Sequence, residues 1–262
     1  MDVHEWRVAG ASAIGTSHLK IGAPCQDTFK YGLYRSVHEG EVILLTVSDG
    51  AGSARFSDIG ADVACREFAS NLELYLADGD RVESLDAVHV RKWFDNVVEA
   101  LNVRATADGA ALRDYACTLL VAVLSRTHAA FAQVGDGAIV VREALEEWCY
   151  IFWPQHGEYI NTTNFITDTS SLEKFEFTLT ARAIHELALF TDGIEPLVLQ
   201  YATNAVHSSF FNAMLPPVRA LPQPGFDTVL SEQLSTYLSS PVICSRTDDD
   251  KTLLLASRLR TL

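Results

Sequence analysis

The 262-residue sequence predicts an α+β fold, a four-layer αββα sandwich in which two mainly antiparallel sheets are flanked by helices. Short apolar runs rich in β-branched residues follow one another with few helices between them. That order favours antiparallel meanders, because a parallel sheet alternates strand and helix. Other segments repeat apolar residues every three or four positions, as one face of a helix does. No repeat, low-complexity tract or linker interrupts the chain, so we expect one domain over residues 1–262.

Seven short apolar runs are predicted as strands. They are residues 41–48, 117–125, 129–134, 138–142, 148–153, 186–191 and 252–257. Three helices are predicted from the apolar stripes that they would bury in the core. The stripes are Phe68, Leu72 and Leu76; Val90, Trp93, Phe94, Val97, Val98 and Leu101; and Phe226, Val229, Leu230, Leu234, Tyr237 and Leu238. The proline-rich stretch from Pro216 to Pro224 is expected to be a loop.

The composition is that of an acidic globular protein, with a formal net charge of −14 and 48% hydrophobic residues. Nucleic acids and anionic membranes bind basic surfaces, so neither is expected as a partner. No secretory signal is visible at the N-terminus, and no apolar stretch approaches the roughly 20 residues that span a bilayer. The five cysteines form no CxxC pair. We therefore expect reduced, mostly buried thiols in a cytoplasmic protein, without a zinc site.

Acidic residues stand at the ends of several predicted strands. An Asp-Gly pair follows three apolar runs, and the Asp triplet at 248–250 precedes a fourth. The three pairs are Asp49-Gly50, Asp136-Gly137 and Asp192-Gly193. The glycine is expected to let the chain turn with positive φ and to let an ion approach the backbone. Two further pairs follow no apolar strand and are interpreted as plain turns, Asp78-Gly79 and Asp108-Gly109.

Clustered carboxylates repel one another unless a cation lies between them, and such hard oxygen ligands suit Mg²⁺ or Mn²⁺. A single Asp-Gly pair is typical of a turn, so spacing alone leaves both a set of turns and a metal site open. Other chemistries lack their motifs. The sequence contains no HExxH zinc helix, no GxSxG elbow, no Walker A loop and no GxGxxG after a strand.

Six motifs occur along the chain in the same order as in one known protein family. They are GTSH with PCQD (15–27), VSDGAGSARFSDIGADVAC (47–65), CTLLVAVL (117–124), VGDGAIVV (134–141), LFTDGIEP (189–196) and RTDDDKTLLLA (246–256). In that order they resemble six elements of the metal-dependent protein phosphatases of the type 2C family, in its compact bacterial branch. Those elements are Gly-x-x-Arg with Asn-Glu-Asp, Asp-Gly-x-Gly and its helix, the Thr-Thr strand, the Gly-Asp-Ser strand, Ser/Thr-Asp-Gly and Asp-Asn-x-Thr. The resemblance spans about residues 10–257.

The resemblance implies a β-sandwich flanked by helices and a site for Mn²⁺ or Mg²⁺, with two ions and a weaker third. Asp49 would bridge two metals, and the carbonyl of Gly50 would complete the shell of one of them. Asp192 and Asp249 would bind the other, Asp249 being chosen within its triplet by the Asp-x-x-Thr spacing. Asp136 resembles the residue that, with Asp192, holds the third metal.

Other positions either match the family pattern or depart from it. Asp27 would hold metal-bound water. His18 stands where the family has its phosphate-binding arginine, and because histidine titrates near pH ~6.5, its contact with phosphate would depend on pH. Gln26 replaces the usual Glu, and Ala51 stands where many eukaryotic members have His. Residues 153–175 do not match the family's flap; they would set substrate choice or merely order a loop.

The implied function is hydrolysis of phosphoserine and phosphothreonine in a protein, the target of a bacterial Ser/Thr kinase, by a water that two metals activate. This reaction needs no nucleophilic side chain, and Cys25 is interpreted as a packing residue. We expect a monomer. A catalytically silent module that binds phosphorylated partners is the alternative, kept open by the loss of arginine at His18. A two-metal hydrolase of small phosphoesters is a third hypothesis.

Overall fold

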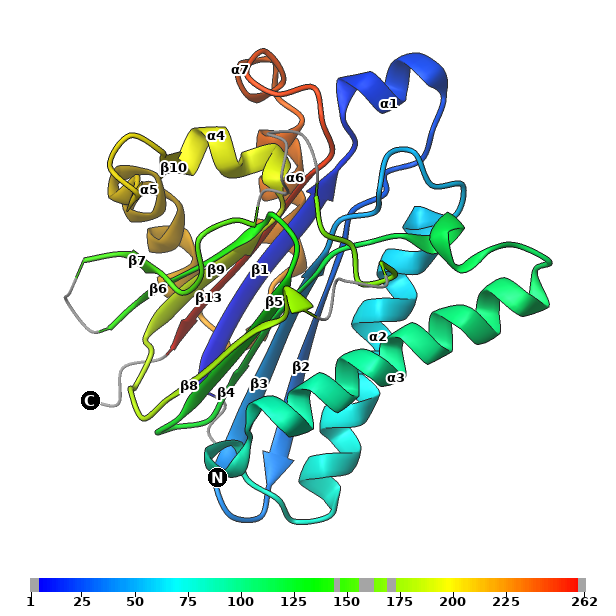
Figure 1. The fold of residues 1–262 in the computed structure, drawn as a ribbon. Coiled ribbons are helices and arrows are strands. Elements are labelled where there is room, and N and C mark those ends of the chain that lie inside the picture. Colours follow the sequence, from blue (N-terminus) through cyan, green and yellow to red (C-terminus); the bar gives the residue numbers. More distant parts are fainter. Residues whose placement is uncertain (1–4, 144–146, 156–162, 169–172, 259–262) are drawn as a thin grey trace.

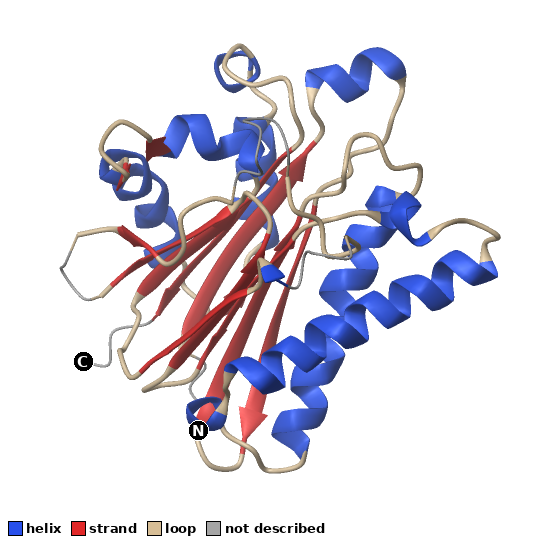
Figure 2. Cartoon of the chain, viewed as in Figure 1, coloured by secondary structure: helices blue, strands red, loops and turns tan. Residues whose placement is uncertain are grey.

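Two β-sheets packed face to face form the centre of the structure, and helices cover their outer sides (Figures 1 and 2). The computed structural model describes residues 5–143, 147–155, 163–168 and 173–258. In spatial order, the first sheet contains β12 (Gly225–Phe226), β1 (Trp6–Ala13), β13 (Lys251–Arg258), β9 (Glu186–Phe190), β6 (Ala138–Arg142) and β7 (Cys149–Tyr150). The second contains β2 (Thr28–Ser36), β3 (Gly40–Ser48), β4 (Leu119–Leu124), β5 (Ala129–Val134) and β8 (Glu176–Thr180).

The strand pairing within the described residues is antiparallel in both sheets, apart from the parallel pair of β1 with β12. A separate small hairpin joins β10 (Leu199–Gln200) to β11 (Ala205–Val206). The expected fold class, two mainly antiparallel sheets flanked by helices, is therefore confirmed.

The described helices are α1 (Thr16–Ile21), α2 (Ser57–Ala77), α3 (Ala87–Ala107), α4 (Glu195–Val198), α5 (Ser208–Arg219), α6 (Thr228–Leu238) and α7 (Pro241–Cys244). The longest of them form the two outer layers, whereas α1 and α7 lie at one end of the sandwich (Figure 1). Short 3₁₀ helices span Val82–Ser84, Leu112–Tyr115 and Asp192–Ile194. One apolar core joins α2 and α3 to the second sheet, and another joins α5 and α6 to the first sheet.

Strand β3 contributes side chains to two different layers of the core. Side chains alternate across a strand, and on β3 Ile43 and Leu45 pack between the two sheets, whereas Val42 and Leu44 pack toward α2 and α3. All of these residues are buried. Burial on both faces explains why this strand reads as a continuous apolar run rather than an alternating one.

The longer apolar strands are confirmed at close to their predicted bounds, but six of the described strands were missed, and three of these, β10, β11 and β12, are only two residues long. Strand β1 is rich in Ala and Gly, which have low β-propensity, and β2 contains Lys30, Gly32 and Arg35, which interrupt its apolar run. Strand β8 is only partly buried along its length. The run at 148–153 is shorter than expected, since only Cys149–Tyr150 pairs with β6.

The stripes on α2 and α3 are confirmed as core faces, and the region after α4 needs two corrections. Phe226 belongs to β12 and stacks on Tyr31, so it is not part of the α6 stripe. Pro216 and Pro217 lie in α5, not in a loop. The buried Phe211, Leu215 and Val218 of that helix follow helical spacing. Their packing offsets the two backbone hydrogen bonds that the prolines cannot donate.

Two further expectations concern membranes and cysteines. Within the described part of the chain, no helix is both long and apolar enough to cross a bilayer. All five cysteines are free thiols. The expectation that most are buried is wrong: Cys65 and Cys117 are buried, Cys25 and Cys244 are half-buried, and Cys149 is exposed on the short strand β7.

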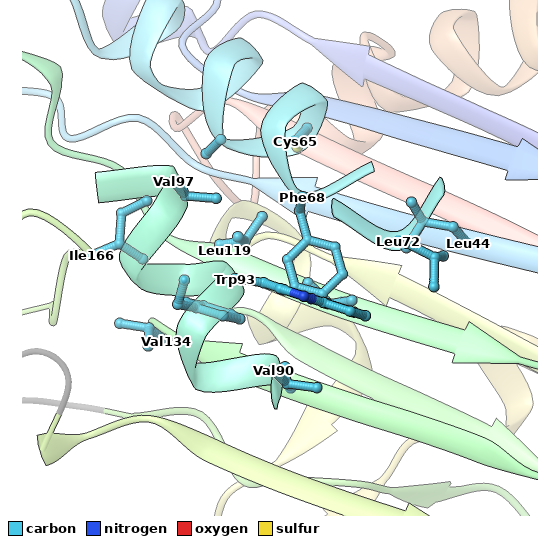
Figure 3. Packing of buried hydrophobic residues seen from close by; sticks show 14 of the residues in the cluster. Leu44, Cys65, Phe68, Leu72, Val90, Trp93, Val97, Leu119, Val134 and Ile166 are labelled. Carbon is cyan, nitrogen blue, oxygen red and sulfur yellow. The ribbon is translucent and has the colours of Figure 1, made fainter. Parts of the chain in front are cut away.

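We predict that Phe68→Ala lowers the free energy of unfolding by about 3–5 kcal/mol, because it leaves a cavity between α2 and α3. Phe68 is fully buried and meets Trp93 and Phe94 edge to face, with ring centroids 5.4 and 5.8 Å away (Figure 3). Leu74→Ala on the same helix is the matched control, because Leu74 is 68% exposed. Urea unfolding measures both, and equal losses would contradict the packing described.

Candidate metal centre

The acidic residues singled out in the sequence gather at one end of the sandwich. This is the end where β1 leads into α1 and β13 follows α7, uppermost in Figure 1. The antiparallel pair Thr28–Ser48 places Asp27 beside Asp49 at this end. Phe190 pairs with both Ala138 and Leu253, which brings the residues after β9 next to those before β6 and β13. Antiparallel pairing therefore collects segments that are far apart in the sequence.

Three of these carboxylates form one compact group. Asp49, Asp136 and Asp192 each offer a carboxylate oxygen, and these oxygens all lie within 4.8 Å of one another. Asp192 Oδ1 is shielded from solvent and has no hydrogen-bond partner among the described residues. A shielded, unpartnered carboxylate oxygen beside two like charges is costly without a cation. The donor set thus fits a divalent cation that prefers oxygen ligands, such as Mg²⁺ or Mn²⁺.

Burial and mutual repulsion change the proton affinities of this group. Burial raises the pKa of Asp27 to about 8, with a further contribution from the charges of Asp250 and Asp192. Burial also raises the pKa of Asp192 to about 7, and Asp136 and Asp249 add to the shift. The pKa of Asp49 lies well above its ordinary value for the same two reasons. Such shifts are typical of groups assembled for binding or chemistry.

The backbone around Asp49 is held by the neighbouring strand. Its N–H donates to Thr118 Oγ1 at 2.9 Å, and its carbonyl accepts from the N–H of Thr118 at 2.8 Å. Gly50 does not have the positive φ expected from the sequence. A Cβ there would instead lie 2.7 Å from the carbonyl oxygen of Ser57 and 2.8 Å from that of Gln26. Close backbone packing, rather than a left-handed turn, requires this glycine.

The turn after β9 is fixed in a similar way. Thr191 Oγ1 donates to Asp27 Oδ2 at 2.7 Å and accepts from the N–H of Thr252 at 2.9 Å. One threonine therefore links β9, β13 and the start of β2. Gly193 packs against the backbone of Asp250, where a Cβ would lie 1.8 Å from the carbonyl oxygen. Asp27 Oδ1 is buried and meets no hydrogen-bond partner within the described ranges, as expected for an oxygen that would face bound water.

The Asp triplet divides into exposed and buried members. Asp249, the residue chosen as a metal ligand, is exposed and outside the group of three, although its charge acts on both Asp49 and Asp192. Asp250 is 2% exposed and accepts hydrogen bonds from the backbone N–H of Gly15 and of Gln26, both at 2.6 Å. The sequence pattern did not reveal this buried role, because the three aspartates are chemically identical.

Two positions that departed from the family pattern, His18 and Ala51, lie near the group, as does Cys25. His18 is buried, and its Nδ1 lies 2.9 Å from Asp250 Oδ2. Ala51 is buried in a small apolar cluster with Ala54 and Ala116. Burial raises the pKa of Cys25 to about 12, so its thiol stays protonated and is not a nucleophile. This agrees with its interpretation as a packing residue.

Two residues near the site were not anticipated. Glu195, three positions after Asp192, is buried, accepts a hydrogen bond from the hydroxyl of Tyr201, and has a pKa raised to about 8 by burial and by the charges of Asp136 and Asp192. Thr163 donates a hydrogen bond to Asp136, so part of the 153–175 segment reaches the site. The only hint was that Glu195 lies within the LFTDGIEP motif. Glu158, Tyr159 and Asn161, considered as ordering residues for that segment, lie outside the described residues.

The remaining Asp-Gly pairs are turns, as expected. Gly79 follows α2 with a φ of 89°, and Gly109 follows α3 with a φ of 65°. Both conformations are left-handed and favour glycine at the end of a helix. The structure therefore contains two kinds of Asp-Gly pair. In the acidic group, the glycine is needed because the backbone packs closely against its neighbours, whereas the other pairs lie at the ends of helices.

We predict that the metal-free protein loses stability as pH rises from about 5 to about 8. Asp27 and Asp192 have folded-state pKa values of about 8 and about 7, above the ordinary 3.8. In this interval the folded protein keeps protons that the unfolded chain releases, so the unfolding free energy falls with pH. Mn²⁺ binds the ionised folded state and should restore stability at pH 8.

Urea unfolding in EDTA and in Mn²⁺ at several pH values measures this effect. Asp192→Asn should flatten the pH profile in EDTA, whereas Asp78→Asn, in a turn outside the site, should leave it unchanged. A profile that rises with pH in EDTA would contradict the repulsion described.

We predict that Gly193→Ala destabilises the protein by more than about 2 kcal/mol, since the added Cβ overlaps backbone that cannot move alone. Gly52→Ala is the matched control, because a Cβ there would meet nothing closer than 3.9 Å. Mn²⁺ titration by calorimetry should also show weaker binding in Gly193→Ala. Equal stability of the two variants would contradict the close approach.

Comparisons with known proteins agree with the site's geometry. The chain is 36% identical over 252 residues to serine/threonine-protein phosphatase 3 of Escherichia coli (strain K12), covering 96% of this chain and 98% of that one. Its fold resembles that of the S. agalactiae serine/threonine phosphatase, with a TM-score of 0.61, 15% identity and coverage of 97% of this chain and 100% of that chain. It also resembles a Staphylococcus aureus serine/threonine phosphatase, with a TM-score of 0.61, 15% identity and coverage of 98% and 97%.

The family model described as protein phosphatase 2C matches residues 14–239, a stretch that contains Asp27, Asp49, Asp136 and Asp192. That match covers most of the chain, and the carboxylates of Asp49, Asp136 and Asp192 within it lie close together. The chain therefore belongs to the protein phosphatase 2C family.

Proposed function

We propose that this chain is a metal-dependent serine/threonine protein phosphatase that hydrolyses phosphoserine and phosphothreonine in protein substrates. The observation that carries the proposal is the convergence of Asp49, Asp136 and Asp192, with their carboxylate oxygens within 4.8 Å of one another. Membership of the protein phosphatase 2C family and the 36% identical serine/threonine phosphatase support the same reaction.

The proposed cofactors are two Mn²⁺ or Mg²⁺ ions and a weaker third. Asp49, the Gly50 carbonyl, Asp192 and Asp249 would hold the first two, and Asp136 with Asp192 would hold the third. When bound, such cations make water acidic enough to ionise near neutral pH and offset the charge of a phosphoryl group. The raised pKa values of Asp49 and Asp192 support this assignment, because a cation would remove the repulsion that raises them.

The protein's own groups would orient the reactants. Thr118 fixes the backbone of Asp49, and Thr191 holds one oxygen of Asp27. The other oxygen, Asp27 Oδ1, is free to accept a proton or a hydrogen bond from water in the site. His18 would contact a phosphate oxygen. With the thiol of Cys25 kept protonated, direct attack by water on phosphorus needs no covalent enzyme intermediate.

The other expectations from the sequence stay proposals. They are a single domain over residues 1–262, a monomer in the cytoplasm, a cognate Ser/Thr kinase, and no nucleic-acid or membrane partner. A silent phosphopeptide-binding module is not favoured, since the buried acidic group and the family relationship both suit catalysis. Hydrolysis of small phosphoesters would use the same groups, and kcat/KM for a small ester and for a phosphoprotein would distinguish the two substrate classes.

We predict that the protein releases phosphate from a phosphothreonine peptide in Mn²⁺ and that EDTA abolishes the release. Asp49→Asn should lower kcat/KM by more than about 100-fold, because it removes a charge from the proposed metal site. Asp78→Asn removes an aspartate from an exposed Asp-Gly turn and should retain full activity. Turnover that persists in EDTA or in Asp49→Asn would refute the metal-dependent mechanism, and Mn²⁺ binding without turnover on any phosphopeptide would favour the silent module.

A further inference from the structure

A buried histidine–aspartate pair lies beside the acidic group. His18 Nδ1 is 2.9 Å from Asp250 Oδ2, and their side chains are 11% and 2% exposed. The pair joins distant parts of the chain, because His18 lies on α1 and Asp250 directly precedes β13. The backbone N–H of Ser17 also donates to the carbonyl of Asp248 at 2.9 Å, which ties α1 to the same turn.

The hydrogen bonds to Asp250 determine which nitrogen of His18 carries a proton. Asp250 Oδ1 accepts from the N–H of Gly15, and Oδ2 accepts from the N–H of Gln26. Apart from His18 Nδ1, the partners of this carboxylate among the described residues are the two backbone N–H groups and the protonated thiol of Cys25, all of which are donors. An ionised carboxylate only accepts hydrogen bonds, so Nδ1 must be the donor. In the neutral ring, Nε2 then carries the lone pair.

The other nitrogen of His18 faces the turn that follows Asp49. A Cβ built on Gly52 would lie 3.9 Å from His18 Nε2 and 3.9 Å from Gln26 Oε1. Gln26 Oε1 is buried and has no hydrogen-bond partner in the part of the chain that the structure describes. Nε2 and this oxygen thus lie on the side of the His18 ring away from Asp250, near the loop that carries Asp49. Gly52 has no side chain to separate them from that loop.

We propose that Asp250 is a positioning residue that holds His18 by Nδ1 and directs Nε2 toward the substrate's phosphate. With a proton on each nitrogen, the ring donates from Nε2 to a phosphate oxygen, while the Asp250 carboxylate balances the charge of the imidazolium. The inference rests on the proposed phosphatase function. It assigns a role to Asp250 and explains how a histidine takes the place that the family resemblance gives to arginine.

An arginine is always charged and needs no carboxylate to fix the position of its protons, whereas a histidine does. The observed contact with Asp250 therefore gives a physical reason why a histidine can act at position 18.

The first test reads the proton position directly and does not depend on turnover. In ¹⁵N-histidine-labelled protein with Mg²⁺, at a pH where the rings are neutral, ¹⁵N shifts and two-bond couplings identify the tautomer of each of the eight histidines. The signals missing in His18→Gln identify His18. We expect the Nδ1–H tautomer at His18, and addition of inorganic phosphate should shift its Nε2 signal. The Nε2–H tautomer would overturn the proposal.

The second test is a double-mutant cycle on kcat/KM for a phosphothreonine peptide. His18→Gln and Asp250→Asn should each lower kcat/KM by about 10- to 100-fold, the value of a hydrogen bond to a charged group. The double variant should be no worse than His18→Gln alone, because Asp250 acts through His18. Additive losses would show that Asp250 only supports the fold, and would overturn the proposal. Asp248→Asn, an exposed neighbour in the same triplet, is the matched control and should keep full activity.

The third variant is a rescue. His18→Arg combined with Asp250→Asn should recover most of the activity that Asp250→Asn loses, since arginine keeps its charge without a carboxylate partner. Unfolding midpoints identify variants that fail to fold, and the tautomer measurement on the unaltered protein then decides the question. If the unaltered protein hydrolyses no phosphopeptide, the proposed function fails, while the tautomer and the phosphate-dependent Nε2 shift still test the pair.

Discussion

Repulsion between carboxylates is the constraint on which the rest of this structure depends. Asp27, Asp49 and Asp192 are brought together at one end of the sandwich, where burial and neighbouring charges raise their pKa values. Left to themselves, such side chains would separate or bind protons. They stay together because Asp49 and Asp192 follow the buried strands β3 and β9, Asp27 precedes β2, which pairs with β3, and the two sheets share an apolar core. The packing of the sandwich holds the charges in a place where a cation stabilises them.

The backbone at the strand ends is packed tightly enough to resist that repulsion. Gly50 and Gly193 approach neighbouring carbonyl groups so closely that no other residue fits without a shift of the chain. Thr118 and Thr191 tie the same turns to adjacent strands through their hydroxyl groups. The acidic end of the molecule is therefore a preorganised site, in which the geometry is formed before any ligand arrives.

The electrostatics of this site explain why cations and a positioned histidine belong together. The chain carries a formal net charge of −14, and an anionic phosphate would be repelled by the cluster of aspartates. Divalent cations would offset the local negative charge, and His18, paired with Asp250, would add a donor that is positive when protonated. The chain shares the fold of the solved phosphatases although it is only 15% identical to them. The strand order and the core depend on the pattern of apolar residues rather than on particular side chains.

The sequence by itself determined the fold class, the longest helices and the kind of site. Apolar runs such as β3 and the apolar stripes of α2 and α3 indicate which residues are buried, because the spacing of residues along a strand or helix determines which face each one occupies. Aspartates at strand ends, such as Asp49 and Asp192, similarly indicated oxygen ligands for a cation. The sequence pattern did not reveal β1, which is stabilised by pairing with β13 more than 200 residues away rather than by its own propensity.

Only the tertiary structure decided which aspartate of the triplet is buried and what His18 contacts. Asp249 and Asp250 are the same residue type, and they differ because the backbone N–H groups of Gly15 and Gln26 donate hydrogen bonds to the carboxylate of Asp250. The same holds for Glu195, whose burial depends on a short helix with no strong periodicity. The local sequence pattern indicates whether a segment forms a helix or a strand. Packing between residues far apart in the sequence determines which individual side chains meet in the site.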